Sequence, residues 1–313
     1  MDFKRVYFAA VFSSLAFVLC AVTSFALRGT STVPNRSAGW TIHANPSRLV
    51  NGAPIYLQVT PPSRLTSLTG TWLGHQVVFD NSGGRAWTAL AGVSLETKAG
   101  TYPFMLEGRT AGGTQVTSRR NFTIGHAKYP VIQLQVSKQF TEPNPEQVQV
   151  IKEDQELKHR TFSQVTPERE WSGRFSAPVD APTSDVFGTR RVFNGATKSV
   201  HQGLDYRVGS GTPVSALNAG TVLLARSLYF EGNCIVLDHG QGLLSLYLHL
   251  SETKVKEGER VQRGQLLGLS GATGRATGPH LHIAVRWQGV YLNPAALLEL
   301  RVSESPAKIS TSQ

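Results

Sequence analysis

Cysteine is almost absent from this chain of 313 residues, which contains only Cys20 and Cys234. Cys20 lies in the long apolar run near the N-terminus, so Cys234 stands alone in the rest of the chain and cannot form an internal disulfide there. The fold must therefore be held by its apolar cores. Cys234 lies in the strand-like string N-C-I-V-L-D, which predicts a buried apolar residue and not a nucleophile.

Acidic residues are also few, since 21 Asp and Glu stand against 31 Lys and Arg, giving a formal net charge of +10. A surface with this excess attracts polyanions over long distances. The sequence lacks a recognition-helix pattern, a zinc knuckle and an aromatic-basic RNA signature, which argues against nucleic acid as a partner. An anionic cell envelope suits the charge better.

One long uncharged run occupies residues 6–27, between Lys4 and Arg5 on one side and Arg28 on the other. It ends in the small-x-small string S-F-A, so residues 1–28 are predicted to be a cleaved signal peptide. A retained membrane anchor is the close alternative, because about 20 apolar residues cross a bilayer. In both cases the positive charge before the run places the rest of the chain outside the cytoplasm, in the periplasm or cell envelope.

The 30 glycines and 16 prolines indicate many turns and a mainly β fold. Between residues 40 and 125, short alternating runs such as I-Y-L-Q-V and R-N-F-T-I are separated by Gly and Pro breaks. Regular spacing of short strands with such breaks predicts an Ig-like β-sandwich domain over 40–125.

Residues 126–174 are predicted to form a linker with one helix at about 145–159. The helix start is indicated by Asn144, which is followed at once by proline and three residues later by glutamine. From 175 to 298 the glycine density rises and strand-like runs return, which predicts a second β domain built on an antiparallel sheet. The polar residues 299–313 are expected to be a disordered tail.

Two strand-like strings carry histidines. In H-L-H-I-A-V-R, which begins at His280, alternate residues face opposite sides, so the aliphatic residues form one face and His280 and His282 share the other. In L-S-L-Y-L-H-L the leucines are expected to form the buried face and His249 the opposite one. Neighbouring strands of one sheet would bring these three histidines together over a groove. His239, in the turn before the second string, is interpreted as structural.

His201 and Asp205, in the string H-Q-G-L-D, complete the candidate site. Four steps of a straight strand separate Cα atoms by about 13 Å, whereas the donor atoms on one zinc ion lie about 3–4 Å apart. We therefore expect a bent segment, with Gly203 permitting the bend.

Of the five site residues, three are natural ligands for one zinc ion and two remain to handle protons. This is the minimum set for metal-assisted hydrolysis, because zinc lowers the pKa of a bound water to about 7. The sequence has no H-E-x-x-H string and no spare carboxylate in these motifs, so a histidine is expected to act as the base. Spacing alone does not decide which member of H-x-H binds the metal.

The strings H-x-x-x-D, Y-x-H-L and G-P-H-L-H, in this order, resemble the LytM/lysostaphin-type M23 metallopeptidases. The surrounding sequence agrees, including F-G-T-R-R-V-F-N-G, G-L-D-Y, G-T-P-V-S-A and D-H-G-Q-G. The resemblance covers roughly residues 175–294. More loosely, A-L-A-G-V-S-L and A-G-T-Y resemble the β-sandwich module that precedes this domain in some members.

Carried over by position, the resemblance implies that His201, Asp205 and His282 bind zinc and that His249 and His280 are the catalytic pair. It implies a metalloendopeptidase that hydrolyses the peptide cross-links of bacterial peptidoglycan. Some members carry a tyrosine shortly before the first ligand that steadies the oxyanion. Here that stretch is F-N-G-A-T-K-S-V, so oxyanion stabilisation would depend on histidine and zinc.

The sequence also suggests two alternative functions. Degenerate members of the resembled family activate other cell-wall hydrolases without catalysis, but those lack ligands, whereas all five positions are intact here. The string V-x-x-G-x-x-V-x-x-G-Q suggests a lipoyl- or biotinyl-like carrier, but no lysine stands at a tight turn tip as a carrier requires. A hydrolase is therefore the preferred hypothesis, and the non-catalytic activator is the alternative.

Overall fold

The computed structural model describes residues 39–302, except 82, 165 and 196. The predicted signal or anchor, residues 1–28, lies outside the described residues, and so does the end of the predicted tail, 303–313. Leu300 and Val302 are buried, so the chain stays packed beyond residue 299, where the tail was expected to begin. In the part of the chain that is described, no helix is long and apolar enough to cross a membrane.

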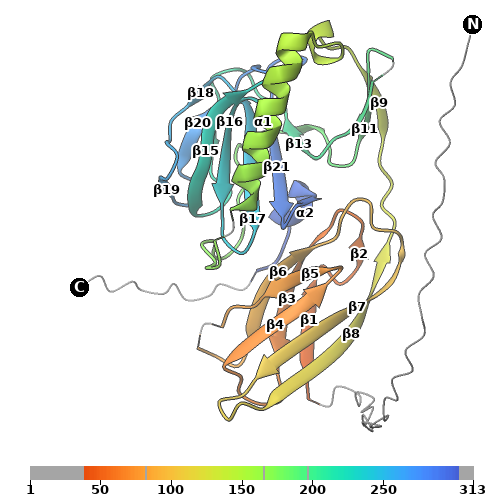
Figure 1. Ribbon diagram of the computed structural model, residues 1–313, viewed down its shortest axis with the longest axis vertical. Helices are drawn as coiled ribbons and strands as arrows, with labels where there is room; N and C mark the ends of the chain where they lie inside the picture. The colour runs from red at the N-terminus through yellow and green to blue at the C-terminus, as the bar shows by residue number, and fades with distance from the viewer. Residues whose placement is uncertain (1–38, 82, 165, 196, 303–313) are drawn as a thin grey trace, which may run out of the picture. The chain divides into compact units, whose positions relative to one another are not determined.

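Residues 41–125 form two β-sheets, drawn in orange and yellow in Figure 1, with the strand orders β1-β3-β6 and β2-β8-β7-β4-β5. The strands are β1 (Thr41–Asn45), β2 (Leu49–Val50), β3 (Pro54–Thr60), β4 (Ser67–Trp72), β5 (His75–Val78), β6 (Trp87–Gly92), β7 (Gly100–Arg109) and β8 (Gln115–Gly125). Burial alternates strictly along β4, so its apolar residues face the interior. There Trp72 packs edge-on against Phe122, with ring centroids 5.6 Å apart. The Ig-like assignment stays a prediction.

The expected helix is present as α1 (Pro145–Ser163), after a single 3-10 turn, η1 (Lys138–Phe140). Its start was correctly predicted, because the side chain of Asn144 accepts from the Gln147 N–H and the Gln147 side chain accepts from the Asn144 N–H. The helix continues past the expected end at residue 159. Leu157 packs on the apolar face of the second β region, and so does Phe162, which lies beyond residue 159 and explains why the helix extends.

The second β region is built on an eight-stranded antiparallel sheet, in the order β10-β13-β21-β17-β16-β15-β19 with β22 paired to β21. These strands are β10 (Thr183–Asp185), β13 (Gly203–Tyr206), β15 (Gly220–Leu228), β16 (Gly232–Asp238), β17 (Leu243–Leu250), β19 (Arg260–Val261), β21 (Leu281–Trp287) and β22 (Val290–Leu292). The mainly β fold class is confirmed.

Two smaller sheets and a short helix complete the described chain. One sheet contains β9 (Val131–Leu134), β11 (Arg190–Phe193) and β12 (Thr197–Val200), and the other contains β14 (Pro213–Ser215), β18 (Glu252–Thr253) and β20 (Leu266–Leu269). The helix α2 (Pro294–Leu298) is capped by the Asn293 side chain, which accepts from the Ala295 N–H.

The two faces of the eight-stranded sheet have different neighbours. On β21, Ile283 belongs to the main core and Ala284 to a second cluster that α1 covers, which is the predicted alternation. On β17 the prediction is wrong. Leu246 pairs with Ala284 and shares its face, whereas Tyr247 is fully buried in the main core, where its hydroxyl accepts from the Leu217 N–H at 2.8 Å.

Cys234 lies in β16 and is buried in the cluster under α1, as the sequence predicted. Burial, followed by the nearby charge of Glu231, raises the pKa of its thiol to about 12. The side chain therefore stays protonated near neutral pH and acts as a small apolar residue.

His239 is buried on the core side of the sheet and takes no part in the cluster of site histidines. Its Nδ1 donates to the Ala219 carbonyl at 2.6 Å, and its Nε2 lies 2.8 Å from the Ser245 hydroxyl, which in turn lies 3.1 Å from the hydroxyl of Tyr247. Burial lowers the pKa of His239, against the opposing effect of the Ala219 carbonyl. The folded state therefore holds this imidazole neutral.

We expect His239→Gln to make the free energy of unfolding less dependent on pH below about 6.5. Unfolded histidine has a pKa of about 6.5, so the stability contributed by the neutral ring is complete above that pH and is lost as the pH falls below it. Urea unfolding at several pH values between 8 and 5 measures this. The variant should be less stable at pH 8 but lose less free energy of unfolding on acidification; parallel curves for the two proteins would contradict the assignment.

Candidate metal centre

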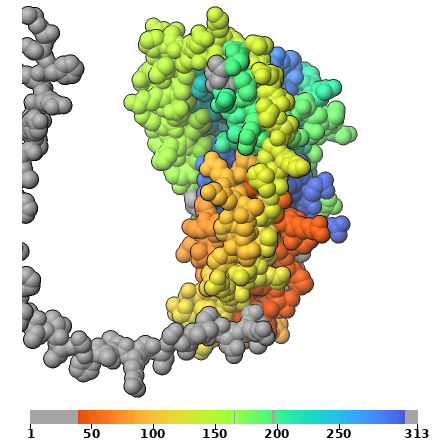
Figure 2. Space-filling view, turned by 90° about the vertical axis from the view of Figure 1, so that its right-hand side faces the viewer, coloured from red at the N-terminus to blue at the C-terminus, as the bar shows by residue number. Residues whose placement is uncertain are grey.

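A groove of about 500 Å³ lies on the face of the eight-stranded sheet that α1 covers. Leu246 and Ala284 contribute to its floor, and Lys158 and Phe162 of α1 to one wall. Residues of β9 and β11 contribute to another wall, and Figure 2 shows the α1 and β11–β12 segments side by side on one face of the molecule.

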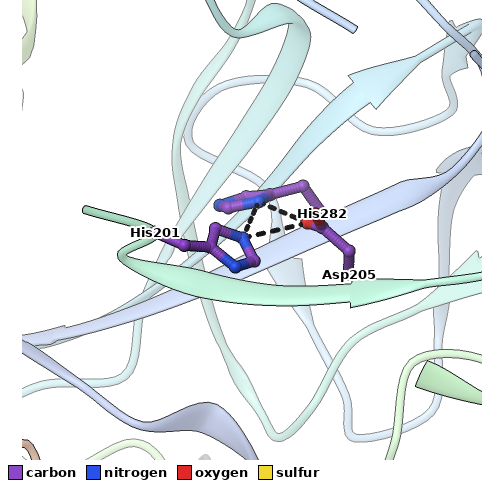
Figure 3. Close-up of side chains that lie close together, drawn as sticks. All are labelled: His201, Asp205 and His282. Atoms are coloured by element: carbon purple, nitrogen blue, oxygen red, sulfur yellow. Dashed lines mark hydrogen bonds and ion pairs between the residues drawn. The ribbon is translucent and has the colours of Figure 1, made fainter. Parts of the chain in front are cut away.

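His201, Asp205 and His282 come together in this groove, with their side chains pointing toward one another (Figure 3). Asp205 in β13 is the direct cross-strand partner of His282 in β21, and this pairing places the two side chains next to each other. His201 lies between β12 and β13, where the chain turns back toward the sheet. All three residues are buried.

Three donor atoms form a small triangle. His201 Nε2 lies 3.0 Å from His282 Nδ1 and 3.1 Å from Asp205 Oδ1, and His282 Nδ1 lies 2.7 Å from Asp205 Oδ1. Ligands of one zinc ion lie about 3–4 Å from one another, and zinc accepts imidazole nitrogen and carboxylate oxygen. The donor set fits zinc, and two of the three spacings lie in this range while the third is slightly shorter. Three protein ligands would leave the fourth position of a tetrahedral zinc ion open.

The protonation states of the triangle suit metal binding. His201 Nδ1 donates to the Val186 carbonyl at 2.9 Å, which leaves the Nε2 lone pair directed at the triangle. Burial lowers the pKa of His282 and so favours its neutral form. Burial alone would raise the pKa of the Asp205 carboxyl, but hydrogen bonds and charge from the His201 and His282 rings, when protonated, outweigh burial and hold that pKa well below the usual range. A metal ion would take the place of these protons.

A half-buried arginine holds the other oxygen of the Asp205 carboxylate. Asp205 lies opposite Asp185 of β10 across the sheet, an arrangement of like charges that is unfavourable by itself. Arg191 of β11 donates to Asp205 Oδ2 at 2.5 Å and to Asp185 Oδ2 at 2.6 Å. Asp185 Oδ2 also lies 3.3 Å from His201 Nδ1. Arg191 therefore compensates both carboxylates and leaves Asp205 Oδ1 free for the triangle.

His249 and His280 lie beside the triangle, with their ring centroids 4.8 Å apart. His249 Nδ1 donates to the Thr273 carbonyl and His280 Nδ1 to the Gly278 carbonyl, both at 2.8 Å. Each ring therefore keeps its Nε2 lone pair available. Burial, followed by the charges of His282 and His280, lowers the pKa of His249 to about 3 in the metal-free site.

The backbone at His249 explains why this side chain reaches the groove. His249 has φ of +62°, the left-handed region that residues with a Cβ rarely adopt, and the pairing of β16 with β17 shifts register next to it. The irregularity places His249 in the groove with Leu246 and Leu248, so the predicted division between leucines and histidine on this strand was wrong.

Gly203 has a different role from the one predicted. It is a regular member of β13, paired with Ala284, and its φ is not in the left-handed region. A Cβ at this position would lie 2.4 Å from His282 Nε2 and 2.3 Å from the Ile283 carbonyl oxygen. Gly203 therefore gives space to the His282 ring, and the bend lies before it, next to His201.

The sequence analysis missed the partners of the site residues. Asp185 and Arg191 were not singled out, although the R-R pair was quoted within F-G-T-R-R-V-F-N-G. The only available signal was an arginine pair shortly before the first candidate ligand. The carbonyl acceptors of the histidines have no sequence signature at all, because any residue supplies one.

We expect Gly203→Ala to lose zinc binding by displacing the His282 ring. The added methyl group meets a backbone oxygen and a ring nitrogen, so overpacking should also cost about 1–3 kcal/mol of stability. Zinc content after dialysis and urea unfolding give the two readouts. Gly209→Ala is the matched control, because a Cβ there has no neighbour within 4 Å; normal zinc content in Gly203→Ala would contradict the role assigned to this glycine.

Arg191→Met should destabilise the zinc-free protein by about 1–3 kcal/mol, because two facing carboxylates lose their shared cation. Urea unfolding in a chelator at pH 7 measures this loss. Arg226→Met, which removes an exposed pair with Glu257, should leave stability nearly unchanged; equal effects of the two substitutions would argue against the ion-pair explanation.

Comparison with known proteins agrees with this geometry. Residues 199–294 match the family described as Peptidase family M23. Peptidoglycan DD-endopeptidase ShyA of Vibrio cholerae is 43% identical over 120 residues, which are 37% of this chain and 28% of ShyA. DD-carboxypeptidase/endopeptidase Mpg of Neisseria meningitidis is 39% identical over 101 residues, 32% of this chain and 23% of Mpg. The chain thus matches about a quarter of the length of these relatives.

A solved structure gives a longer match. The crystal structure of a Pseudomonas aeruginosa protein assigned to peptidase M23 is 31% identical and has a TM-score of 0.61. The match covers 80% of this chain and 95% of that one, so it includes both β regions described above. The chain therefore belongs to peptidase family M23.

Proposed function

We propose that this M23 protein is a zinc-dependent endopeptidase that hydrolyses the peptide cross-links of bacterial peptidoglycan. The observation that carries the proposal is the approach of His201, Asp205 and His282 within hydrogen-bond distance in an open groove. The names of ShyA, a peptidoglycan DD-endopeptidase, and of Mpg, a DD-carboxypeptidase/endopeptidase, support peptidoglycan as the substrate.

In this proposal His201, Asp205 and His282 hold the zinc ion. Zinc would polarise the scissile carbonyl and lower the pKa of the attacking water toward neutrality. Two neutral imidazoles and one carboxylate give a ligand set with a single negative charge. Arg191 balances the second oxygen of Asp205, so the buried carboxylate keeps a fixed orientation.

His249 and His280 would handle the protons. Each ring commits its Nδ1–H to a backbone carbonyl, so each can accept a proton only at Nε2. One ring takes the proton of the attacking water and later returns it to the leaving amine. The other can stabilise the oxyanion only while its Nε2 carries a proton, so the two rings must differ in protonation during turnover.

The proposal includes a location outside the cytoplasm. The uncharged run at 6–27 after Lys4 and Arg5 supports export, with cleavage favoured over a retained anchor. The net charge of +10 supports attraction to the anionic cell envelope.

Two histidine variants should separate metal binding from catalysis. His249→Ala is expected to keep zinc and lose turnover by about 10²–10⁴-fold, the usual contribution of a positioned acid or base. His282→Ala is expected to lose the metal together with activity. Zinc content and mass spectrometry of cross-linked muropeptide dimers after incubation with each full-length protein measure the two effects.

His43→Ala is the matched control, because His43 is an exposed histidine of β1. It should keep both zinc and activity. Near-normal rates in His249→Ala would show that the roles of the pair are wrong. A zinc-loaded wild-type protein that leaves the dimers intact would favour the non-catalytic activator instead.

A further inference from the structure

Most charged side chains of the groove are already paired. Lys158 of α1 forms an ion pair with Glu231 at 2.5 Å. Arg191 pairs with both Asp185 and Asp205. Each acid that lines the groove therefore has a cation of the protein beside it, although the buried Oε2 of Glu231 has no hydrogen-bond partner among the described residues.

Two further arginines line the groove, Arg207 and Arg275, and neither has an ion pair among the described residues. Arg207 is exposed, whereas Arg275 is half-buried. Glu231 attracts Arg275 electrostatically, but it lies beyond ion-pair distance and its Oε1 is held by Lys158. Arg275 is thus a partly desolvated cation in the groove without a carboxylate of its own.

The guanidinium of Arg275 is held in place by aromatic rings. Its Cζ lies 4.9 Å from the ring centroid of Phe193 and 4.6 Å from that of Phe230. The backbone N–H of Arg275 also donates to the Phe230 carbonyl at 2.8 Å. Rings that cover the faces of a guanidinium leave its in-plane N–H groups free, and these suit bidentate binding of a carboxylate.

The same loop positions Arg275 and the histidine pair. Thr273 accepts from His249, Gly278 accepts from His280, and Arg275 lies between these two residues in sequence. The loop is anchored at Gly274, where a Cβ would lie 2.3 Å from the backbone nitrogen of Gly232. Arg275, His249 and His280 line the same groove, so a peptide that lies along the groove with its scissile bond at the histidine pair can contact Arg275.

We propose that Arg275 binds a free carboxylate carried by the substrate peptide close to the scissile bond, and so makes the enzyme selective for acidic stem peptides over amidated ones. This inference rests on the proposed peptidase function. It adds a determinant of specificity that is separate from zinc binding and from proton transfer.

The test compares two substrates with the zinc-loaded full-length protein. One is a cross-linked muropeptide dimer with free carboxylates, and the other is the same dimer with its carboxyl groups converted to amides. A charge-assisted bond to a guanidinium should make kcat/KM about 10- to 100-fold higher for the free carboxylates. Arg275→Gln should remove this preference by lowering the rate on the free dimer to that on the amidated dimer.

Two variants serve as comparisons. Arg207→Gln removes the other unpaired arginine of the groove and should keep the full preference. Arg275→Lys keeps the charge but not the planar fork, and should keep part of the preference. Zinc content and melting temperature are measured for each variant, so that a folding defect is recognised.

Several results would overturn the inference. If the wild-type protein cleaves both dimers equally well, Arg275 does not bind a substrate carboxylate, although the proposed function still stands. If Arg275→Gln slows both dimers by the same factor, the residue is only structural. If Arg207→Gln abolishes the preference, the carboxylate binds at Arg207. If the zinc-loaded wild-type protein cleaves neither dimer, the proposed function fails first, and the inference fails with it.

Discussion

The direct pairing of Asp205 with His282 across two antiparallel strands is the constraint on which the site depends. It fixes two donor atoms 2.7 Å apart without any loop. This register also determines which residues are needed at neighbouring positions. Gly203 must leave room for the imidazole, and Arg191 must compensate the acid that β10 brings opposite Asp205. A slip of one residue would move the aspartate to the opposite face of the sheet.

The remaining site residues depend on departures from regular structure. His201 lies where the chain turns between two strands, and His249 has a left-handed backbone beside a shift in register. Strained backbone of this kind persists only where the surrounding structure determines it. Here the Thr273 carbonyl and the packed sheet hold His249. The regular pairing thus provides two corners of the triangle, Asp205 and His282, and irregular backbone brings His201 and His249 to them.

Sequence reasoning succeeded where periodicity is undisturbed. The alternation along β21 correctly placed His282 on the face opposite Ile283, and the Asn144 cap correctly marked the start of α1. The prediction failed on β17, because a register shift changes which side chains share a face. No residue type in the sequence indicates such a shift. Sequence reasoning also missed Arg191, because an ion pair between separate strands depends on the assembled sheet. Gly203 was noted for backbone freedom, whereas its effect is the space that it leaves.

The long sequence separation within the triangle has a consequence for how the metal is acquired. Asp205 and His282 are 77 residues apart, and they meet only after β13 and β21 have paired. An ion that needs both would bind the folded chain and not the unfolded one, so its binding free energy adds to the free energy of folding. Zinc would then stabilise the sheet only after these strands have paired. The concentration of metal where the chain folds would therefore affect how much folded protein persists.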